Sequence, residues 1–261
     1  MNRKTAIVTG AYGAIGQAIA AGVAAAGYRV TLAGRDRSLL EKTQAALIHR
    51  TSNPEIFYEV VDLGLHSQIR EFSRRWDGPL HLLVNNAATA PRRRAETTEG
   101  IEVQWATNVL GYFWMMRYFH PFMGGQANAR IVNVSSYWAG GMNTVDPEFK
   151  TRPYDNDVAY RQAKQANRML SAAFATRLKP YGITVNSCHP GDVNSKLSNA
   201  FGFGGSESPA EGAATPLYLA LSDEVRNVSG NYYEHLKPVA CGFCKEPAAI
   251  DQLYDLCDKM L

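Results

Sequence analysis

Tyr160 and Lys164 are a pair of residues whose types and spacing could do proton chemistry. If they stand on a helix, four positions apart, their side chains lie on one face and project together. A free tyrosine has a pKa of about 10 and exchanges protons poorly at neutral pH. A neighbouring ammonium favours the phenolate and would lower that pKa, which would suit Tyr160 to general acid and base catalysis. The pentapeptide YRQAK alone fits an exposed helical turn better, so the chemistry depends on what surrounds it.

Short β-branched stretches alternate with helix-length segments along the chain. The stretches that predict strands are Thr5–Thr9, Arg29–Ala33, Ile56–Val61, Leu80–Val84, Arg130–Val134 and Ile183–Ser187. The segments that predict helices are Ala14–Ala26, Ser38–Ile48, Leu65–Trp76, Thr98–Phe122, Val158–Leu178, Pro209–Leu221 and Pro247–Met260. This alternation predicts an α/β fold of the Rossmann type, a doubly wound parallel sheet with helices on both faces. No linker interrupts the series, so we expect a single domain over residues 1–261.

The first predicted strand runs into a glycine-rich turn, TGAYGAIG at positions 9–16, and then into an alanine-rich helix. Glycines in such a turn let the backbone approach a pyrophosphate, and the helix N-terminus supplies free N–H groups. Many glycine-rich turns only connect a strand to a helix, but the place of this one in the series favours dinucleotide binding. We therefore expect a dinucleotide-binding half at 1–135. Residues 136–261 would supply the catalytic helix, the substrate loops and a C-terminal segment.

The second predicted strand ends with LAGRD at positions 32–36, where a dinucleotide-binding domain selects its cofactor. An acidic side chain there holds a ribose 2′-hydroxyl, whereas an arginine suits a 2′-phosphate. Arg35 therefore favours NADP(H), with NAD(H) possible, and the alternative is that Arg35 is a solvated surface charge. Asp36 precedes the next helix, with Ser38 and Glu41 in capping-box spacing, and is better explained as a helix cap.

Taken in order, the motifs are similar to those of the short-chain dehydrogenase/reductase family over nearly the whole chain. The glycine-rich turn resembles the family's pattern with Ala14 for the middle glycine, and NNAA at 85–88 resembles NNAG with Ala88 for the glycine. The segments RQAKQANRML and SGNYYEHLKP resemble the branch of retinol dehydrogenases and related carbonyl reductases. The other matching positions are Asp62-Leu63, Asn108 in ATNVLG, Ser136 in IVNVSS, Tyr160 and Lys164 in YxxxK, and Pro190-Gly191-Asp192-Val193.

The resemblance implies a catalytic set of Asn108, Ser136, Tyr160 and Lys164. In that set Tyr160 exchanges the proton, Lys164 also bonds the nicotinamide ribose, Ser136 orients the substrate oxygen, and Asn108 helps to hold a relay water. The implied reaction is hydride transfer between the nicotinamide and a carbonyl or alcohol. The implied cofactor-binding residues are Gly10, Tyr12, Gly13, Ala14, Ile15, Gly16, Arg35, Asp62, Leu63, Asn86, Ala87, Ala88, Tyr160, Lys164, Pro190, Gly191, Val193 and Ser195.

The gap between Ser136 and Tyr160 is longer than is usual in the family, and residues 137–159 look like an insertion over the substrate pocket. Tyr137, Trp138 and Phe149 could shape that pocket. The segment after Ser195 would be a lid. Alternatively, both segments are surface loops whose aromatic side chains pack onto the core. The residues expected to contact a small to medium lipophilic substrate are Tyr137, Trp138, Phe201 and Phe203.

Composition excludes several classes of partner. A net charge of +3 gives no reason to expect nucleic acid. The first predicted strand begins too early to leave room for a signal peptide, and polar residues interrupt the apolar stretches, so we expect a cytoplasmic protein without a membrane span. Cys241 and Cys244 have zinc-ligand spacing, which His235 and Cys257 could complete, but structural zinc sites usually have two close pairs. We expect no metal and bystander thiols. We also expect Arg92–Arg94 to be a solvated run and His189 to be structural.

Two functional hypotheses of different classes remain. The first is an NADPH-dependent carbonyl reductase that also works as an alcohol dehydrogenase. The second is a catalytically silent nucleotide sensor or scaffold with the same fold, and the complete catalytic set favours the enzyme. Many members of the family pair the two helices near 108–122 and 158–178 into a homodimer. The apolar residues available for such a pairing are Tyr112, Met116, Phe119, Leu170 and Phe174, which core packing explains almost as well.

Overall fold

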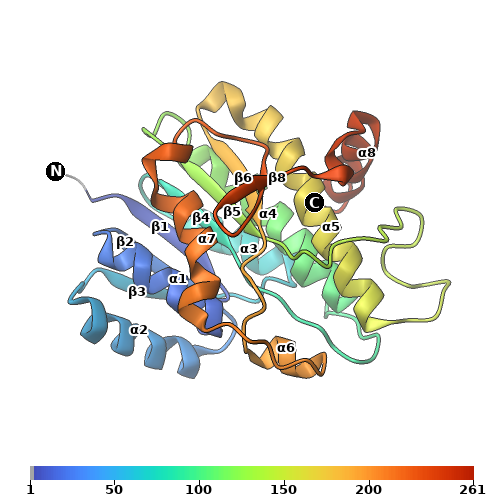
Figure 1. Ribbon diagram of the computed structural model, residues 1–261, viewed down its shortest axis with the longest axis horizontal. Coiled ribbons are helices and arrows are strands. Elements are labelled where there is room, and N and C mark those ends of the chain that lie inside the picture. Colours follow the sequence, from blue (N-terminus) through green and yellow to red (C-terminus); the bar gives the residue numbers. More distant parts are fainter. Residues whose placement is uncertain (1–2) are drawn as a thin grey trace.

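An eight-stranded sheet runs through residues 3–261, the part of the chain that the computed structural model describes (Figure 1). The strand order is β3-β2-β1-β4-β5-β6-β7-β8. Strands β1 to β7 pair in parallel, and β8 pairs with β7 in the antiparallel sense at the edge. The strands are β1 Thr5–Thr9, β2 Arg29–Gly34, β3 Ile56–Val60, β4 Leu82–Asn85, β5 Arg130–Val134, β6 Thr184–Cys188, β7 Tyr232–Glu234 and β8 Lys237–Val239.

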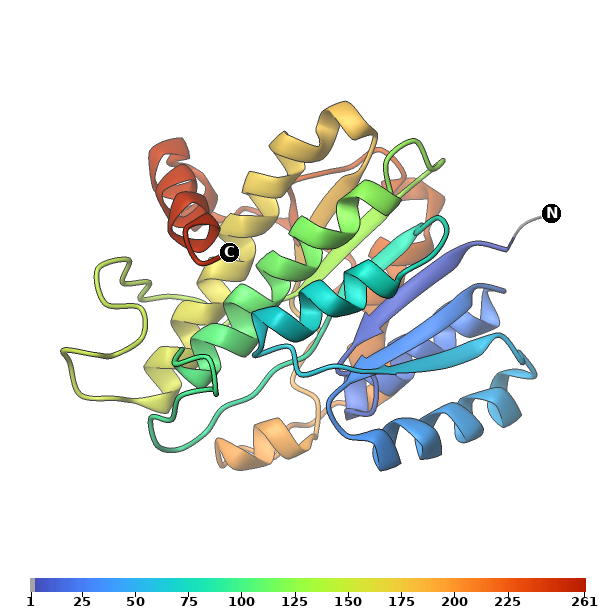
Figure 2. The ribbon, with the colours of Figure 1, turned by 180° about the vertical axis from the view of Figure 1, so that it is seen from behind.

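Helices cover both faces of the sheet. One apolar core lies between the sheet and α1, α2 and α7, and the other lies between the sheet and α3, α4 and α5, with α8 packed outside α5 (Figures 1 and 2). Within residues 3–261, no helix has both the length and the apolar character that a bilayer crossing requires. The helices are α1 Ala14–Ala25, α2 Arg37–Thr51, α3 His66–Arg75, α4 Gly111–Phe119, α5 Asn156–Leu178, α6 Lys196–Ala200, α7 Pro209–Leu221 and α8 Pro247–Asp258.

The predicted doubly wound sheet is confirmed, and the alternation of apolar runs is the reason that it could be predicted. Strands buried on both faces read as nearly continuous apolar runs, and β1, β4 and β5 are buried along almost their whole length. The last two strands, β7 and β8, were not predicted, because three-residue strands in a glycine-rich segment leave no periodic pattern.

The helix predicted at Thr98–Phe122 is wrong in its first part. Gly100 has a φ of 76°, which ends any helix at that point, and Glu96 and Glu102 form an isolated antiparallel bridge instead. Helical structure begins at Val103, passes through a π-helix at Trp105–Leu110 and continues as α4. The π-helix matters because the predicted catalytic asparagine lies within it.

The five apolar residues offered for a homodimer lie inside this chain. All five have at most 1% of their surface exposed, so the alternative of core packing is the correct one. Helix α8 explains part of this burial, because Tyr254 packs its ring against Phe113 and Phe174 at 5.2 and 5.3 Å between centroids. The side chains buried in this way are Tyr112, Met116, Phe119, Leu170 and Phe174.

Candidate active site

The carboxyl ends of four neighbouring strands carry the segments that the sequence marked as functional. The glycine-rich turn follows β1, Asn86 follows β4, Ser136 lies two residues beyond β5, and Pro190 lies two residues beyond β6. Strands β1, β4, β5 and β6 are consecutive in the sheet. The strand order runs from β1 to β3 on one side and from β4 to β6 on the other, so the order changes direction between the parallel strands β1 and β4. Ligands of doubly wound folds bind outside the carboxyl ends of the strands at such a switch point.

The glycine-rich turn is held against the end of β4. The Thr9 hydroxyl accepts hydrogen bonds from the backbone N–H groups of Asn86 and Ala87, at 2.9 and 3.1 Å. A Cβ added to Gly10 would lie 2.7 Å from the Ala87 Cα. One added to Gly16 would lie 2.2 Å from the Gly10 carbonyl oxygen. Gly10 is therefore required for the approach of the turn to the segment after β4, and Gly16 for the close packing of α1 on the turn.

The N-terminus of α1 offers donors to a phosphate. Gly13 is the N-cap residue, and no side chain caps the first N–H groups of the helix. Ala14 and Ile15 form the first turn and are half-buried, so the methyl group of Ala14 stands where the family has a glycine without closing the turn. An uncapped helix N-terminus behind a tight glycine turn fits the pyrophosphate of a dinucleotide.

Arg35 lies at the end of β2 with its side chain exposed. It makes no hydrogen bond or ion pair with any other residue in the range 3–261. The Tyr12 ring packs on Gly34, the residue before Arg35, where an added Cβ would approach it to 2.6 Å. Asp36 is the N-cap of α2, accepting from the Leu39 N–H at 3.0 Å, as predicted. The Ser38 capping box does not form, because Asp36 already caps the helix.

The remaining predicted cofactor residues border this edge of the sheet. Asp62 lies two residues beyond β3, whose last residue Val60 pairs with Gly34 on β2, and its carboxylate accepts from the Gly64 N–H at 2.9 Å. Leu63 is buried, and Ala88 is half-buried beyond Asn86.

Tyr160 and Lys164 lie on α5, next to the carboxyl end of β5. The Lys164 ammonium lies 5.5 Å from the centre of the Tyr160 ring and donates to the Val134 carbonyl at 2.9 Å. The Ser135 hydroxyl donates to the Lys164 carbonyl at 2.7 Å, which fixes α5 to the strand end. Ser136 follows directly, and its hydroxyl accepts from the Trp138 N–H at 3.2 Å. Three of the four predicted catalytic residues are thus brought together.

Burial governs the protonation of this pair. Burial raises the pKa of the Tyr160 phenol, and a hydrogen bond with Ser136 offsets part of that rise. The Lys164 ammonium is fully enclosed, and burial lowers its pKa to about 7. The prediction that Lys164 lowers the pKa of Tyr160 is therefore wrong for the protein's own groups. Desolvation of the phenol outweighs an ammonium that is itself partly deprotonated at neutral pH.

Asn108 is fully buried on the π-helix, and its amide is occupied by protein partners. Its oxygen accepts from the Thr89 N–H, and its nitrogen donates to the Thr89 carbonyl, both at 2.8 Å. The same nitrogen donates to the Gln104 side-chain oxygen at 3.2 Å. The side chain therefore holds the segment after β4 in place and does not line the cavity beside Tyr160.

Gln104 is a residue of this site that sequence analysis missed. Its amide nitrogen donates to the Tyr154 hydroxyl at 2.9 Å and to the Asn156 carbonyl at 3.1 Å, while its oxygen receives the bond from Asn108. It thus joins the asparagine to the start of α5. A signal was present, because Gln104 and Asn108 are polar, four apart and surrounded by the apolar residues of a helix.

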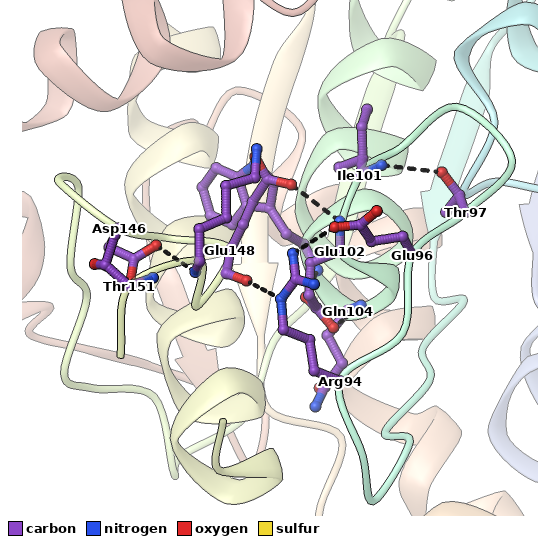
Figure 3. Close-up of polar contacts among 11 residues, drawn as sticks. Arg94, Glu96, Thr97, Ile101, Glu102, Gln104, Asp146, Glu148 and Thr151 are labelled. Carbon is purple, nitrogen blue, oxygen red and sulfur yellow. Dashed lines mark hydrogen bonds and ion pairs between the residues drawn. The ribbon is translucent and has the colours of Figure 1, made fainter. Parts of the chain in front are cut away.

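The loop at 137–155 is clamped to the segment before the π-helix (Figure 3). The Arg94 guanidinium donates to the Glu148 carbonyl at 2.9 Å and pairs with Glu96 at 2.8 Å. The Glu148 carboxylate accepts from the Glu102 N–H at 3.0 Å. Arg92 and Arg93 are exposed as predicted, but Arg94 is half-buried, so the prediction of a solvated run is wrong for it. Glu148, which accepts from both Arg94 and Glu102, lies more than forty residues away in sequence from each of them.

Tyr160 and Ser136 line a cavity of about 60 Å³ together with a cluster of aromatic side chains. The Phe201 ring lies 4.9 Å from the Tyr160 ring, and Trp138 packs on Phe203 at 4.6 Å between centroids. Ser195 caps the short helix α6, which carries Phe201 at its end. Besides these, the lining consists of Ile15, Ser135, Tyr137, His189, Pro190, Gly191, Asp192, Val193, Leu197 and Ser198.

Phe149 does not reach the cavity, so the expectation that it shapes the pocket is wrong. Its ring packs on Tyr154 at 5.3 Å, and the Arg152 guanidinium covers it at 3.8 Å. His189 lines the cavity but behaves as a neutral structural residue, because burial lowers its pKa to about 4. Its ring packs against Tyr137 at 4.7 Å.

Comparison with known proteins agrees with this geometry. The sequence description of the short chain dehydrogenase family matches residues 4–202. The chain belongs to the short-chain dehydrogenase family. It is 33% identical to mouse retinol dehydrogenase 13 over 257 residues, covering 91% of this chain and 77% of the relative. It is 30% identical to human retinol dehydrogenase 14 over 301 residues, covering 100% and 87%. A solved structure from Mycobacterium paratuberculosis has a TM-score of 0.83 at 26% identity, covering 98% and 92%.

As a short-chain dehydrogenase of the retinol dehydrogenase-like branch, the chain is an oxidoreductase acting on CH–OH or C=O groups, as predicted. Its cofactor is a nicotinamide dinucleotide, NAD(H) or NADP(H). The family match ends at residue 202, so β7, β8 and α8 lie beyond it.

Proposed function

We propose that this short-chain dehydrogenase transfers hydride between NADP(H) and a small to medium lipophilic carbonyl or alcohol, with Tyr160 as the general acid and base. The observation that carries the proposal is one cavity shared by Tyr160, Ser136 and two residues of the cofactor edge, Ile15 and Val193. A proton donor, an oxygen-orienting hydroxyl and a dinucleotide turn thus meet within reach of one substrate.

Separate groups of residues would hold the cofactor, orient the substrate and transfer the proton. The turn at Gly10–Gly16 would hold the pyrophosphate, and Asp62 and Leu63 would contact the adenine. Pro190–Ser195 would hold the nicotinamide side, and Asn86–Ala88 would also contact the cofactor. When bound, the nicotinamide supplies or accepts the hydride. Ser136 would orient the substrate oxygen and Tyr160 would give it a proton. Because burial raises the pKa of Tyr160, its phenol is protonated at neutral pH, which favours carbonyl reduction.

The walls of the cavity support an apolar substrate. The lining includes the apolar side chains of Trp138, Leu197, Phe201 and Phe203, and the Phe201 ring lies 4.9 Å from the Tyr160 ring. A volume of about 60 Å³ is far below the about 300 Å³ at which ligand pockets begin. Substrate entry would therefore require Phe201 to leave the Tyr160 ring, and a movement of α6 with its flanking glycines is the simplest way to achieve this.

Turnover of NADPH with a panel of aldehydes, ketones and quinones tests the activity. Tyr160→Phe keeps the ring and its packing, so NADPH should still bind while kcat falls by about a hundredfold or more. Tyr181→Phe is the control for removing a phenol oxygen outside the cavity, because Tyr181 is exposed and does not line it. Tyr160→Phe retaining more than about a tenth of kcat would place the proton donor elsewhere. NADPH binding without any turnover by the wild type would favour the sensor instead.

Arg35→Ala tests the cofactor. The exposed guanidinium of Arg35 would make charge-assisted bonds to the 2′-phosphate, so its loss should weaken NADPH binding by about ten- to a hundredfold and leave NADH nearly unchanged. Arg37→Ala is a matched control, because that arginine is also exposed but already engages Tyr58 and Glu41. Equal losses for both nucleotides by titration calorimetry would contradict the NADP(H) assignment.

A further inference from the structure

A pair of cysteines lies in the tail beyond the family match. Cys241 and Cys244 flank a single 3-10 turn, Gly242–Cys244, between β8 and α8 (Figure 1). The turn rests on α5, where the Cys244 thiol lies 3.6 Å from the Arg168 carbonyl. Neither the dehydrogenase chemistry nor the packing of the two cores uses these sulfurs.

The turn brings the two sulfur atoms into direct contact. The Cys244 thiol donates to the Cys241 sulfur at 3.0 Å, and the Cys244 N–H donates to the Cys241 carbonyl at 3.1 Å. A turn closed in this way keeps its end Cα atoms within about 7 Å, which is the separation that a disulfide can span. Both cysteines are partly exposed, whereas Cys188 and Cys257 are completely buried.

The surroundings make the two sulfurs unequal. Cys241 receives the hydrogen bond from Cys244, and the Phe243 N–H and the Arg168 guanidinium add further positive partners. These interactions lower the pKa of the Cys241 thiol to about 6. The same contact raises the pKa of Cys244, which keeps its proton. One attacking thiolate beside one protonated thiol is the arrangement found in reactive Cys-X-X-Cys pairs.

The donor set does not build a metal site. Among residues 3–261, no three His, Cys, Asp or Glu side chains converge at this turn or elsewhere. Cys257, which the sequence offered as a further ligand, lies on α8 with its side chain enclosed in the core. A structural zinc ion usually has four protein ligands, and this pair of cysteines supplies only two of them.

We propose that Cys241 and Cys244 are a reversible dithiol–disulfide couple that exchanges with low-molecular-weight disulfides, with Cys241 as the attacking sulfur. The Cys241 thiolate attacks one sulfur of the external disulfide, forms a mixed disulfide and releases one thiolate. Cys244 then loses its proton and attacks Cys241, which releases the second thiolate and closes the intramolecular bond. Two protein thiols are oxidised, one external disulfide is reduced to two thiols, and the balance needs no further oxidant.

Mass spectrometry of the intact folded chain treated with glutathione disulfide tests the couple. The wild type should lose two hydrogen masses and keep no glutathione, and peptide mapping should place the bond between Cys241 and Cys244. Cys244→Ser should hold one glutathione on Cys241, because the resolving thiol is missing. At about pH 6, Cys241→Ser should react about tenfold more slowly, because an ordinary thiol of pKa about 8.5 has roughly a hundredfold less thiolate at that pH and its higher nucleophilicity recovers only about fifteenfold. Cys188 and Cys257 serve as internal controls and should react only after unfolding.

The pH profile of Cys241 alkylation distinguishes this pair from two ordinary thiols. At neutral pH a thiol of pKa about 6 has roughly thirtyfold more thiolate than one of pKa about 8.5, but its nucleophilicity falls by about fifteenfold. The midpoint of the profile is therefore a better measure than the rate. It should lie near pH 6 in the wild type and rise toward about 8.5 in Cys244→Ala, which has lost the donor.

Three results with the reacting chain would overturn the proposal, and a fourth result is the absence of any reaction. They are stable glutathione adducts on both cysteines of the wild type, faster trapping at Cys244 than at Cys241, and an unshifted pH midpoint in Cys244→Ala whose circular dichroism matches the wild type. No oxidation in the folded chain under conditions that oxidise the unfolded chain would also refute it.

Discussion

Lys164→Met should stabilise the protein near neutral pH even though it removes a residue of the proposed active site. The Lys164 side chain is fully buried, and its ammonium donates to the Val134 carbonyl. Methionine has a similar length and no charge, and the Val134 oxygen keeps the Tyr112 hydroxyl as a donor at 3.2 Å. The substitution therefore removes the penalty for burying an ammonium and leaves no carbonyl without a partner.

The magnitude follows from the pKa of Lys164, which burial lowers from 10.5 to about 7. Between these two values the unfolded chain binds a proton that the folded chain does not. The stability of the wild type therefore rises with pH through this window and is lost as the pH falls through it. At up to about 1.4 kcal/mol per pH unit, a change from about pH 7 to about pH 9 should stabilise the wild type by about 2–3 kcal/mol relative to Lys164→Met.

Thermal melting of the wild type, Lys164→Met and Lys42→Met at the two pH values provides the assay. Lys42 is exposed on α2, so its variant controls for removing a lysine charge. Titrations that the three proteins share cancel in the comparison. The gap in melting temperature between the wild type and Lys164→Met should narrow by about 4–12 °C at the higher pH. A gap that stays constant would show that Lys164 is not a buried base with a lowered pKa.

Two further substitutions test the frame around the site. Gln104→Met removes the bonds to Asn108, Tyr154 and Asn156 and should cost about 1.5–4.5 kcal/mol of stability and lower kcat. Gln162→Met, which loses contacts with the same loop but none with Asn108, should lower stability with a smaller effect on kcat, and equal kcat values would contradict this positioning role. Gly16→Ala should weaken NADPH binding by about tenfold or more, because its Cβ would lie 2.2 Å from the Gly10 oxygen. The control Gly242→Ala meets open space, and a similar loss in both, measured by nucleotide titration, would refute the steric argument.

The sheet, its crossovers and the cluster of Ser136, Tyr160 and Lys164 could be predicted from sequence because each rests on a local pattern. Nearly continuous runs of apolar residues mark the buried strands, and the YxxxK spacing places two side chains on one helical face. The same local argument failed for the pKa of Tyr160. Burial decides its direction, and burial depends on Phe201 and the surrounding fold rather than on a neighbour four residues away.

The start of the helix before Asn108 shows a second limit. Residues 98–104 have helical composition, but Glu102 turns its carboxylate to the N–H groups of Gln104 and Trp105, at 2.9 and 2.7 Å. The Glu102 N–H in turn donates to the carboxylate of Glu148, a residue 46 positions away in sequence. Helices are predicted from sequence windows shorter than these separations, so such partners cannot be recognised in the prediction.

The clamp on the loop at 137–155 also has a consequence for the order in which the protein folds. Arg94 reaches the loop across 54 positions of sequence, and Gln104 reaches Tyr154 across 50. Loops of this size close later than local helices form. During refolding, α5 should therefore form before the loop docks, and Asn108 should gain its bond to a fixed Gln104 only in the last step. Recovery of activity after dilution from denaturant should then lag behind recovery of the helical signal.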